Sequence, residues 1–271
     1  MKGMELSRGY FEEYGKPMID TQLAQYKQYL AAGLVGEGSE CLGFDDVFSA
    51  DHDFGPAFCI WMPEQIYARA GAEIQRAYDS LPAFYQGYAR ITSAQGGGRV
   101  GALSLEGFYS RFTGLSRAPK DNMEWFRIPE RFLATVTNGE VFADYLGTFT
   151  QIRSVLKTFY PEDVLKKKLA ARCAVMAQAG QYNYGRCMKR GDSQAAYLAC
   201  SEFVKTAMSA IYLLNEAYMP YYKWIFRGAE NFRILKTAAE LLAELTHITD
   251  QPENSGRKEQ LIEQICISVG C

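Results

Sequence analysis

The sequence has few of the residues on which several classes of functional site depend. It contains only two histidines, His52 and His247, and none of its seven cysteines stands in a Cys-x-x-Cys pair. Zinc sites usually draw their ligands from such closely spaced Cys and His residues. A zinc site is therefore not predicted.

The sequence also lacks a long apolar run, because Lys, Arg, Asp or Glu interrupts every candidate segment. A transmembrane helix needs about 20 consecutive apolar residues, so we expect no membrane partner. The first residues, MKGMEL, become polar and acidic too early for a secretory signal. A cytoplasmic location is the resulting expectation.

A strong charge of either sign is missing as well. The formal net charge is −2, and the nearest approach to a basic stripe is the short run Lys166–Lys168. Proteins that bind nucleic acid usually cluster many Lys and Arg residues on one face. The composition therefore disfavours a nucleic-acid partner and favours a small molecule.

The apolar spacing predicts an α+β chain in two parts, with helices and strands alternating in the first half and only helices after about residue 150. We expect a small mixed sheet with flanking helices over residues 1–155 and a helical bundle over residues 156–271. The predicted helices of the first half include Leu6–Tyr14, Pro17–Leu30 and Pro63–Leu81, and its predicted strands are Ala31–Gly36, Asp51–Met62 and Arg99–Glu106.

The segment between the first two predicted strands holds the most specific pattern. Gly38-Ser39 follows the first strand, and Asp51-His52-Asp53 opens the second. Strand alternation places Asp51 and Asp53 on one face, where two carboxylates can hold hard divalent cations. A Gly-Ser turn lets backbone N–H groups and a hydroxyl approach phosphate oxygens. Together these features predict a site for a nucleoside triphosphate and two metal ions, suited to phosphoryl or nucleotidyl transfer.

Gly38-Ser39, a gap of eleven residues and Asp51-His52-Asp53 resemble the signature of the polymerase-β-like nucleotidyltransferase superfamily. The helical second half resembles that of its small-molecule branch, the aminoglycoside and lincosamide nucleotidyltransferases. The whole chain is similar to an uncharacterised bacterial group of these proteins, including the segments Gly180–Tyr184 and Tyr221–Trp224. The first motif is specific, whereas the second half shares architecture more than residues.

The resemblance implies a fold and an activity. Residues 1–155 would form the nucleotidyltransferase domain, and the enzyme would move a nucleoside monophosphate, from ATP or another triphosphate, to a hydroxyl of an unknown small molecule. Asp51 and Asp53 would hold two Mg²⁺ ions, and Glu106 is the best match to the third carboxylate of the superfamily. Gly38 and Ser39 would hold the outer phosphates. The family pattern is compatible with a homodimer that completes the cleft.

Three assignments in this set have competing interpretations. Glu106 could be an exposed strand-end residue, and Lys223, which matches a family lysine that reaches the triphosphate, has aromatic neighbours typical of a core or hinge. Tyr182, Tyr184 and Arg186 form a polar and aromatic cluster that suits a substrate pocket. The same cluster equally suits tyrosines packed between domains.

The acceptor is the most open part of the prediction. One alternative keeps the fold and transfers the nucleotide to a protein side chain or tRNA. A glycosyltransferase could also use Asp-x-Asp, but it would need a larger nucleotide-binding domain than these strands supply. A binding module without catalysis is disfavoured by the intact acidic pair. Glu202 and Glu216 lie on predicted helices, and neither is assigned as the general base.

Overall fold

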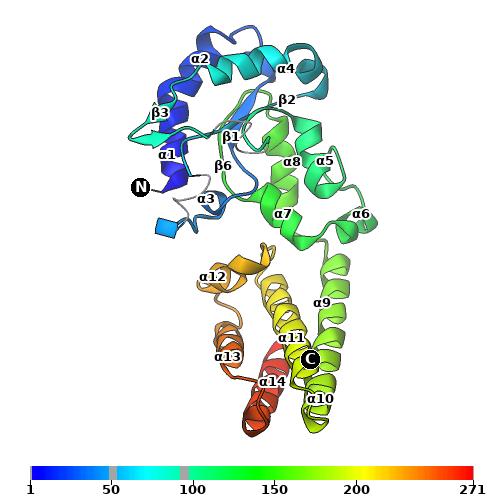
Figure 1. Ribbon diagram of the computed structural model, residues 1–271. Coiled ribbons are helices and arrows are strands. Elements are labelled where there is room, and N and C mark those ends of the chain that lie inside the picture. The colour runs from blue at the N-terminus through cyan, green and yellow to red at the C-terminus, as the bar shows by residue number, and fades with distance from the viewer. Residues whose placement is uncertain (1, 49–53, 92–97, 271) are drawn as a thin grey trace. The chain divides into compact units, whose positions relative to one another are not determined.

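The computed structural model describes residues 2–48, 54–91 and 98–270. The chain divides into two compact units, Met1–Lys120 with Phe132–Thr158 and Asp121–Arg131 with Phe159–Cys271. The first unit contains a small mixed four-stranded sheet, and the second is built from helices (Figure 1). The predicted α+β class and the small mixed sheet with flanking helices are therefore confirmed.

The sheet of the first unit has the strand order β5-β2-β1-β6. Only β2 and β5 run parallel, whereas β1 pairs antiparallel with β2 and with β6. The strands are β1 (Ala31–Leu34), β2 (Cys59–Met62), β5 (Gly101–Ser104) and β6 (Glu140–Asp144), with a separate hairpin of β3 (Phe84–Tyr85) and β4 (Tyr88–Ala89). The helical segments are α1 (Gly3–Tyr10), η1 (Phe11–Gly15), α2 (Lys16–Thr21), η2 (Lys27–Tyr29), α3 (Ser39–Leu42), α4 (Glu64–Asp79), α5 (Leu105–Thr113) and α8 (Thr148–Lys157). Helix α7 (Glu130–Thr137) runs across the division between the units.

Both faces of the central strand β2 are buried. Ile60 and Met62 pack in one apolar cluster with Ile74 of α4. Trp61 points to the other face, where its ring stacks on Phe149 of α8 with 4.0 Å between the centroids. A strand covered on both faces is apolar throughout instead of alternating, and all four residues of β2 are buried.

The second strand is shorter than predicted. β2 begins at Cys59, and residues 54–58 lie outside any strand. Pro56 lacks the N–H that a strand ladder needs, and a Cβ on Gly55 would collide with the carbonyl oxygen of Ala89. Residues 51–53 of the predicted strand lie outside the described residues.

Two further predicted boundaries are wrong. The third strand ends at Ser104, whose Oγ accepts a hydrogen bond from the N–H of Gly107 and so caps α5. Glu106 consequently lies in the first turn of a helix. At the N-terminal end, α1, η1 and α2 continue without interruption through Gly15, because a π-helical turn accommodates the glycine against the rings of Phe11 and Phe58.

The second unit packs around α11, a helix of 22 residues. Eight consecutive residues of this helix, 206–213, are buried, as expected for a helix with neighbours on all sides. The elements of this unit are α6 (Asn122–Arg127), α9 (Glu162–Met176), η4 (Ala177–Tyr184), α10 (Gly185–Lys189), α11 (Ser193–Leu214), η5 (Tyr222–Trp224), α12 (Ile225–Ala229), α13 (Lys236–His247), η6 (Pro252–Asn254) and α14 (Ser255–Val269). Across the described ranges, no helix has the length and apolar character required to cross a bilayer.

Candidate functional site

The turn after β1 has a backbone that requires glycine at two positions. Gly36 and Gly38 have φ angles of 133° and 134°, a region that residues with a Cβ rarely occupy. Asn138 fixes the turn, because its Nδ2 donates to the carbonyl of Gly36 at 2.7 Å and its Oδ1 accepts from the Gly36 N–H at 3.0 Å. Ser39 then begins α3. The predicted Gly-Ser turn is thus present, and a side chain distant in the sequence holds it in place.

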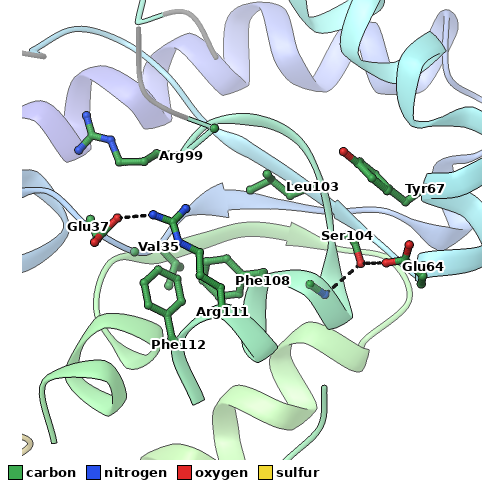
Figure 2. Close-up of a pocket in the computed structure, with 13 residues that line it drawn as sticks. Val35, Glu37, Glu64, Tyr67, Arg99, Leu103, Ser104, Phe108, Arg111 and Phe112 are labelled. Carbon is green, nitrogen blue, oxygen red and sulfur yellow. Dashed lines mark hydrogen bonds and ion pairs between the residues drawn. The ribbon is translucent and has the colours of Figure 1, made fainter. Parts of the chain in front are cut away.

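A cavity of about 360 Å³ lies beside this turn (Figure 2). Its volume is at the lower end of the range for small-molecule sites, roughly 300–1,000 Å³. Apolar and aromatic side chains make most of the wall, and a few charged or polar groups lie among them, as in many ligand pockets. The wall includes Val35, Tyr67, Leu103, Phe108 and Phe112, and the polar groups are Glu37, Glu64, Arg99, Ser104 and Arg111.

Two guanidinium groups line the cavity on the side of the glycine turn. Arg111 of α5 donates to Glu37 at 2.9 Å, and each of these two side chains is 49% exposed. An ion pair this exposed stabilises a fold by only about 0–1 kcal/mol. Arg99 is the second cation of the wall. An anionic ligand could therefore replace Glu37 at Arg111 at little cost in stability.

The opposite side of the cavity is formed where β2 and β5 end. These strands are parallel, with Met62 opposite Ser104, so the helices that follow them begin at the same edge of the sheet. Ser104 Oγ donates to the carboxylate of Glu64, and Glu106 Oε2 accepts from the Glu64 N–H at 2.8 Å (Figure 2 shows the first contact). Glu106 thus binds the N-terminal end of α4. Its other carboxylate oxygen makes no hydrogen bond within the described ranges.

The acidic pair of the sequence motif cannot be placed in this geometry. Asp51 and Asp53 lie outside the described residues, as does His52. In the part of the chain that the structure describes, no three His, Cys, Asp or Glu side chains come together as a metal site would require. The joint role predicted for Asp51, Asp53 and Glu106 stays a prediction.

The remaining predicted site residues belong to the second unit. Lys223 lies in η5, with its Nζ 5.0 Å from the ring centroid of Trp224. Tyr182 is 57% exposed, and the guanidinium of Arg186 lies 4.8 Å from the centre of its ring. Tyr184, by contrast, is fully buried in the apolar core of this unit. The structure therefore brings Tyr182 and Arg186 together at the surface and places Tyr184 in the core.

Most polar residues of the cavity were not predicted as site residues. Glu64 was recognised only as part of a helix start, and Ser104 only as part of a strand, although each contacts the other. Arg99 and Arg111 stand at no spacing that marks a site. Asn138 gave no signal either, because its partner Gly36 is 102 residues away in the sequence.

Comparison with known proteins adds one partial match. Residues 125–225 match the model of a family described as a domain of unknown function, DUF4037. No curated protein and no solved structure matches the chain. All the residues that line the cavity precede the matched segment.

Proposed function

We propose that the chain is a metal-dependent nucleotidyltransferase. It moves a nucleoside monophosphate, with AMP from ATP as the first candidate, to a hydroxyl of a small molecule and releases pyrophosphate. The observation that supports this proposal is the fixed turn Gly36–Ser39 beside a cavity of ligand size. In the sequence, the same turn is separated by eleven residues from the pair Asp51 and Asp53.

In this proposal the glycine turn and the two arginines bind the triphosphate. The turn presents backbone N–H groups and the Ser39 hydroxyl to the outer phosphates, because glycine allows a close approach of the backbone. Arg99 and Arg111 offset the phosphate charge, and the planar guanidinium suits paired hydrogen bonds to phosphate oxygens. Arg111 exchanges its exposed contact with Glu37 for the ligand.

Asp51, Asp53 and Glu106 are the proposed ligands of Mg²⁺. Mg²⁺ prefers carboxylate and phosphate oxygens, and Glu106 has one carboxylate oxygen that accepts no hydrogen bond in the described part of the chain. Mg²⁺ held by these carboxylates would neutralise charge on the transferring phosphate. The contact of Glu106 with the Glu64 N–H fixes the position of its carboxylate before any ligand binds.

The apolar wall of the cavity is proposed to hold the nucleoside part of the donor. Phe108, Phe112 and Tyr67 line the wall together with Leu103. Aromatic side chains of this kind stack on a nucleobase without depending on its identity. The geometry therefore favours a nucleotide donor but does not distinguish among the four bases.

Titration calorimetry tests the proposal. ATP, GTP, CTP and UTP are titrated, each with Mg²⁺, into the wild type and into the Asp51→Asn/Asp53→Asn variant. Glu12→Gln/Glu13→Gln, which removes two exposed charges from η1, is the matched control. We expect metal-dependent binding that is lost in the Asn variant and retained in the control. Absence of nucleotide binding by folded wild-type protein would contradict the proposal.

A further inference from the structure

The second unit contains a buried positive charge that has no ion-pair partner among the described residues. Lys168 of α9 is 7% exposed. Its Nζ lies 4.8 Å from the ring centroid of Tyr160 and 5.2 Å from that of Phe126. Among the described residues it makes no hydrogen bond or ion pair, although an ammonium group has three N–H donors. The aromatic faces stabilise the charge but accept none of these hydrogen bonds in the usual sense.

The nearby carboxylate is already bound by other groups. Glu130 accepts from Arg172 at 2.7 Å through Oε1 and from Ser209 at 2.9 Å through Oε2. Arg172 Nε also donates to Ser209 Oγ at 2.8 Å, so the three side chains form a closed set of hydrogen bonds. Glu130 neutralises Arg172, which leaves the charge of Lys168 in excess. Burial and Arg172 both lower the pKa of Lys168, and Glu130 only partly opposes them.

Tyr160, whose ring lies against the Lys168 ammonium, carries a second buried hydrogen-bond donor. Tyr160 is 6% exposed, and its hydroxyl has no hydrogen-bond partner within the described ranges. Burial and the charge of Glu130 raise the pKa of Tyr160, so the phenol stays protonated and can donate. A buried donor without an acceptor costs free energy, and here two such donors come together. Within the described ranges neither Lys168 nor the Tyr160 hydroxyl has an acceptor, because the nearby Glu130 is bound by Arg172 and Ser209.

We propose that Lys168 and Tyr160 form an anion site in the second unit that binds a phosphate group. A phosphate has several acceptor oxygens, so it can accept from the ammonium and from the phenol together while offsetting the excess charge. Lysine serves as a point charge in many phosphate sites. Lys168 retains a small exposed area. This site does not depend on the proposed nucleotidyl transfer.

Phosphate-dependent thermal unfolding of the full chain tests the site. Inorganic phosphate, pyrophosphate and ATP without metal are compared with chloride at equal ionic strength. Lys168→Met keeps the apolar stem between the rings and removes the charge, and Tyr160→Phe removes only the hydroxyl. Lys167→Met is the matched control, because Lys167 is the exposed neighbour whose Nζ lies 5.3 Å from the same Phe126 ring.

We expect phosphate, but not chloride, to raise the unfolding temperature of the wild type in a saturable manner, because the ligand binds only the folded state. Lys168→Met should abolish the shift, Tyr160→Phe should weaken phosphate binding about tenfold, and Lys167→Met should retain it. A stronger shift with ATP whose excess is lost in Lys168→Met would identify a nucleotide as the source of the phosphate, and equal shifts would identify free phosphate.

Two results would overturn the site. One is a wild type whose unfolding temperature responds equally to phosphate and chloride. The other is a loss of the shift in Lys167→Met that matches the loss in Lys168→Met. If Lys168→Met does not fold, the phosphate response of Tyr160→Phe tests the site instead. This variant removes only the hydroxyl and keeps the packing of the ring. The Asp51→Asn/Asp53→Asn variant should keep the phosphate response, which separates failure of this site from failure of the proposed enzymatic function.

Discussion

Asn138 makes both backbone hydrogen bonds of Gly36, donating to its carbonyl at 2.7 Å and accepting from its N–H at 3.0 Å. The two residues are 102 positions apart, and Asn138 follows α7 at the point where the chain turns toward β6. The amide side chain thus acts as a partner for the backbone where β1 ends. The conformation of the proposed phosphate-binding turn is therefore set by a residue outside the Gly-Ser motif.

Asn138→Ala should loosen the turn. It leaves the N–H and the carbonyl of Gly36 without their partner, which should lower the free energy of unfolding by about 1–3 kcal/mol and weaken nucleotide binding. Urea unfolding and calorimetry measure the two effects. Asn122→Ala, at an exposed position in α6, is the control and should change stability by less than about 0.5 kcal/mol. Equal stability of the two variants would show that the contact with Gly36 is not needed.

The ion pair of Glu37 and Arg111 should contribute little to stability, whereas Arg111 alone should contribute much to triphosphate binding. A double-mutant cycle with Glu37→Gln and Arg111→Met should give a coupling free energy below about 1 kcal/mol, because both side chains are half exposed. Arg111→Met should weaken binding of the triphosphate about tenfold, since a charge-assisted hydrogen bond is lost. Glu37→Gln should leave binding unchanged or strengthen it. If Glu37→Gln weakens binding as much as Arg111→Met does, Glu37 is itself part of the ligand site.

The thiol of Cys59 should make stability fall at alkaline pH. Burial raises the pKa of Cys59 to about 12, and its Sγ donates to the carbonyl of Arg99 at 3.0 Å. Above the unfolded pKa of 9.0, the unfolded chain has lost this proton while the folded protein keeps it. The protonated thiol therefore contributes fully to the free energy of unfolding below pH 9.0. This contribution decreases by roughly 1.4 kcal/mol per pH unit as the pH rises toward the folded pKa.

Urea unfolding under reducing conditions at pH 8 and pH 10.5 measures this contribution. Cys59→Ala creates a small cavity, so it should be less stable than the wild type at pH 8. The difference between the two proteins should shrink at pH 10.5, because the variant has no thiol to titrate at this position. A difference that stays constant across this range would contradict the raised pKa.

The buried ion pair of Lys258 and Asp250 should be costly to break from one side only. Lys258 is almost fully buried, donates to the carbonyl of Ile248 at 3.2 Å and pairs with the Asp250 carboxylate. Lys258→Met leaves that mostly buried carboxylate without its cation and should destabilise the protein by about 3–5 kcal/mol. Adding Asp250→Asn to this variant should recover a large part of the loss in urea unfolding. If the double variant is no more stable than Lys258→Met, the cost comes from packing and not from charge.

The sequence by itself determined the elements whose pattern is local. The helical spacing after Pro63 predicted a helix that the structure shows as α4, Glu64–Asp79. Gly38-Ser39 predicted a tight turn, and the turn is there because Gly36 and Gly38 adopt angles that disfavour other residues. The strand β6 was missed, since all five of its residues are partly buried and show no alternation.

Only the tertiary structure decided which side chains meet at the cavity. Glu64 and Ser104 come together because β2 and β5 pair in parallel, and Asn138 reaches Gly36 because the end of α7 lies against the end of β1. Glu106 turned out to hold the start of α4 because a cap at Ser104 ends the strand two residues earlier than its apolar pattern indicates. Local spacing determines which face of an element is apolar. The pairing of strands and helices depends on burial between distant segments, which no short stretch of sequence contains.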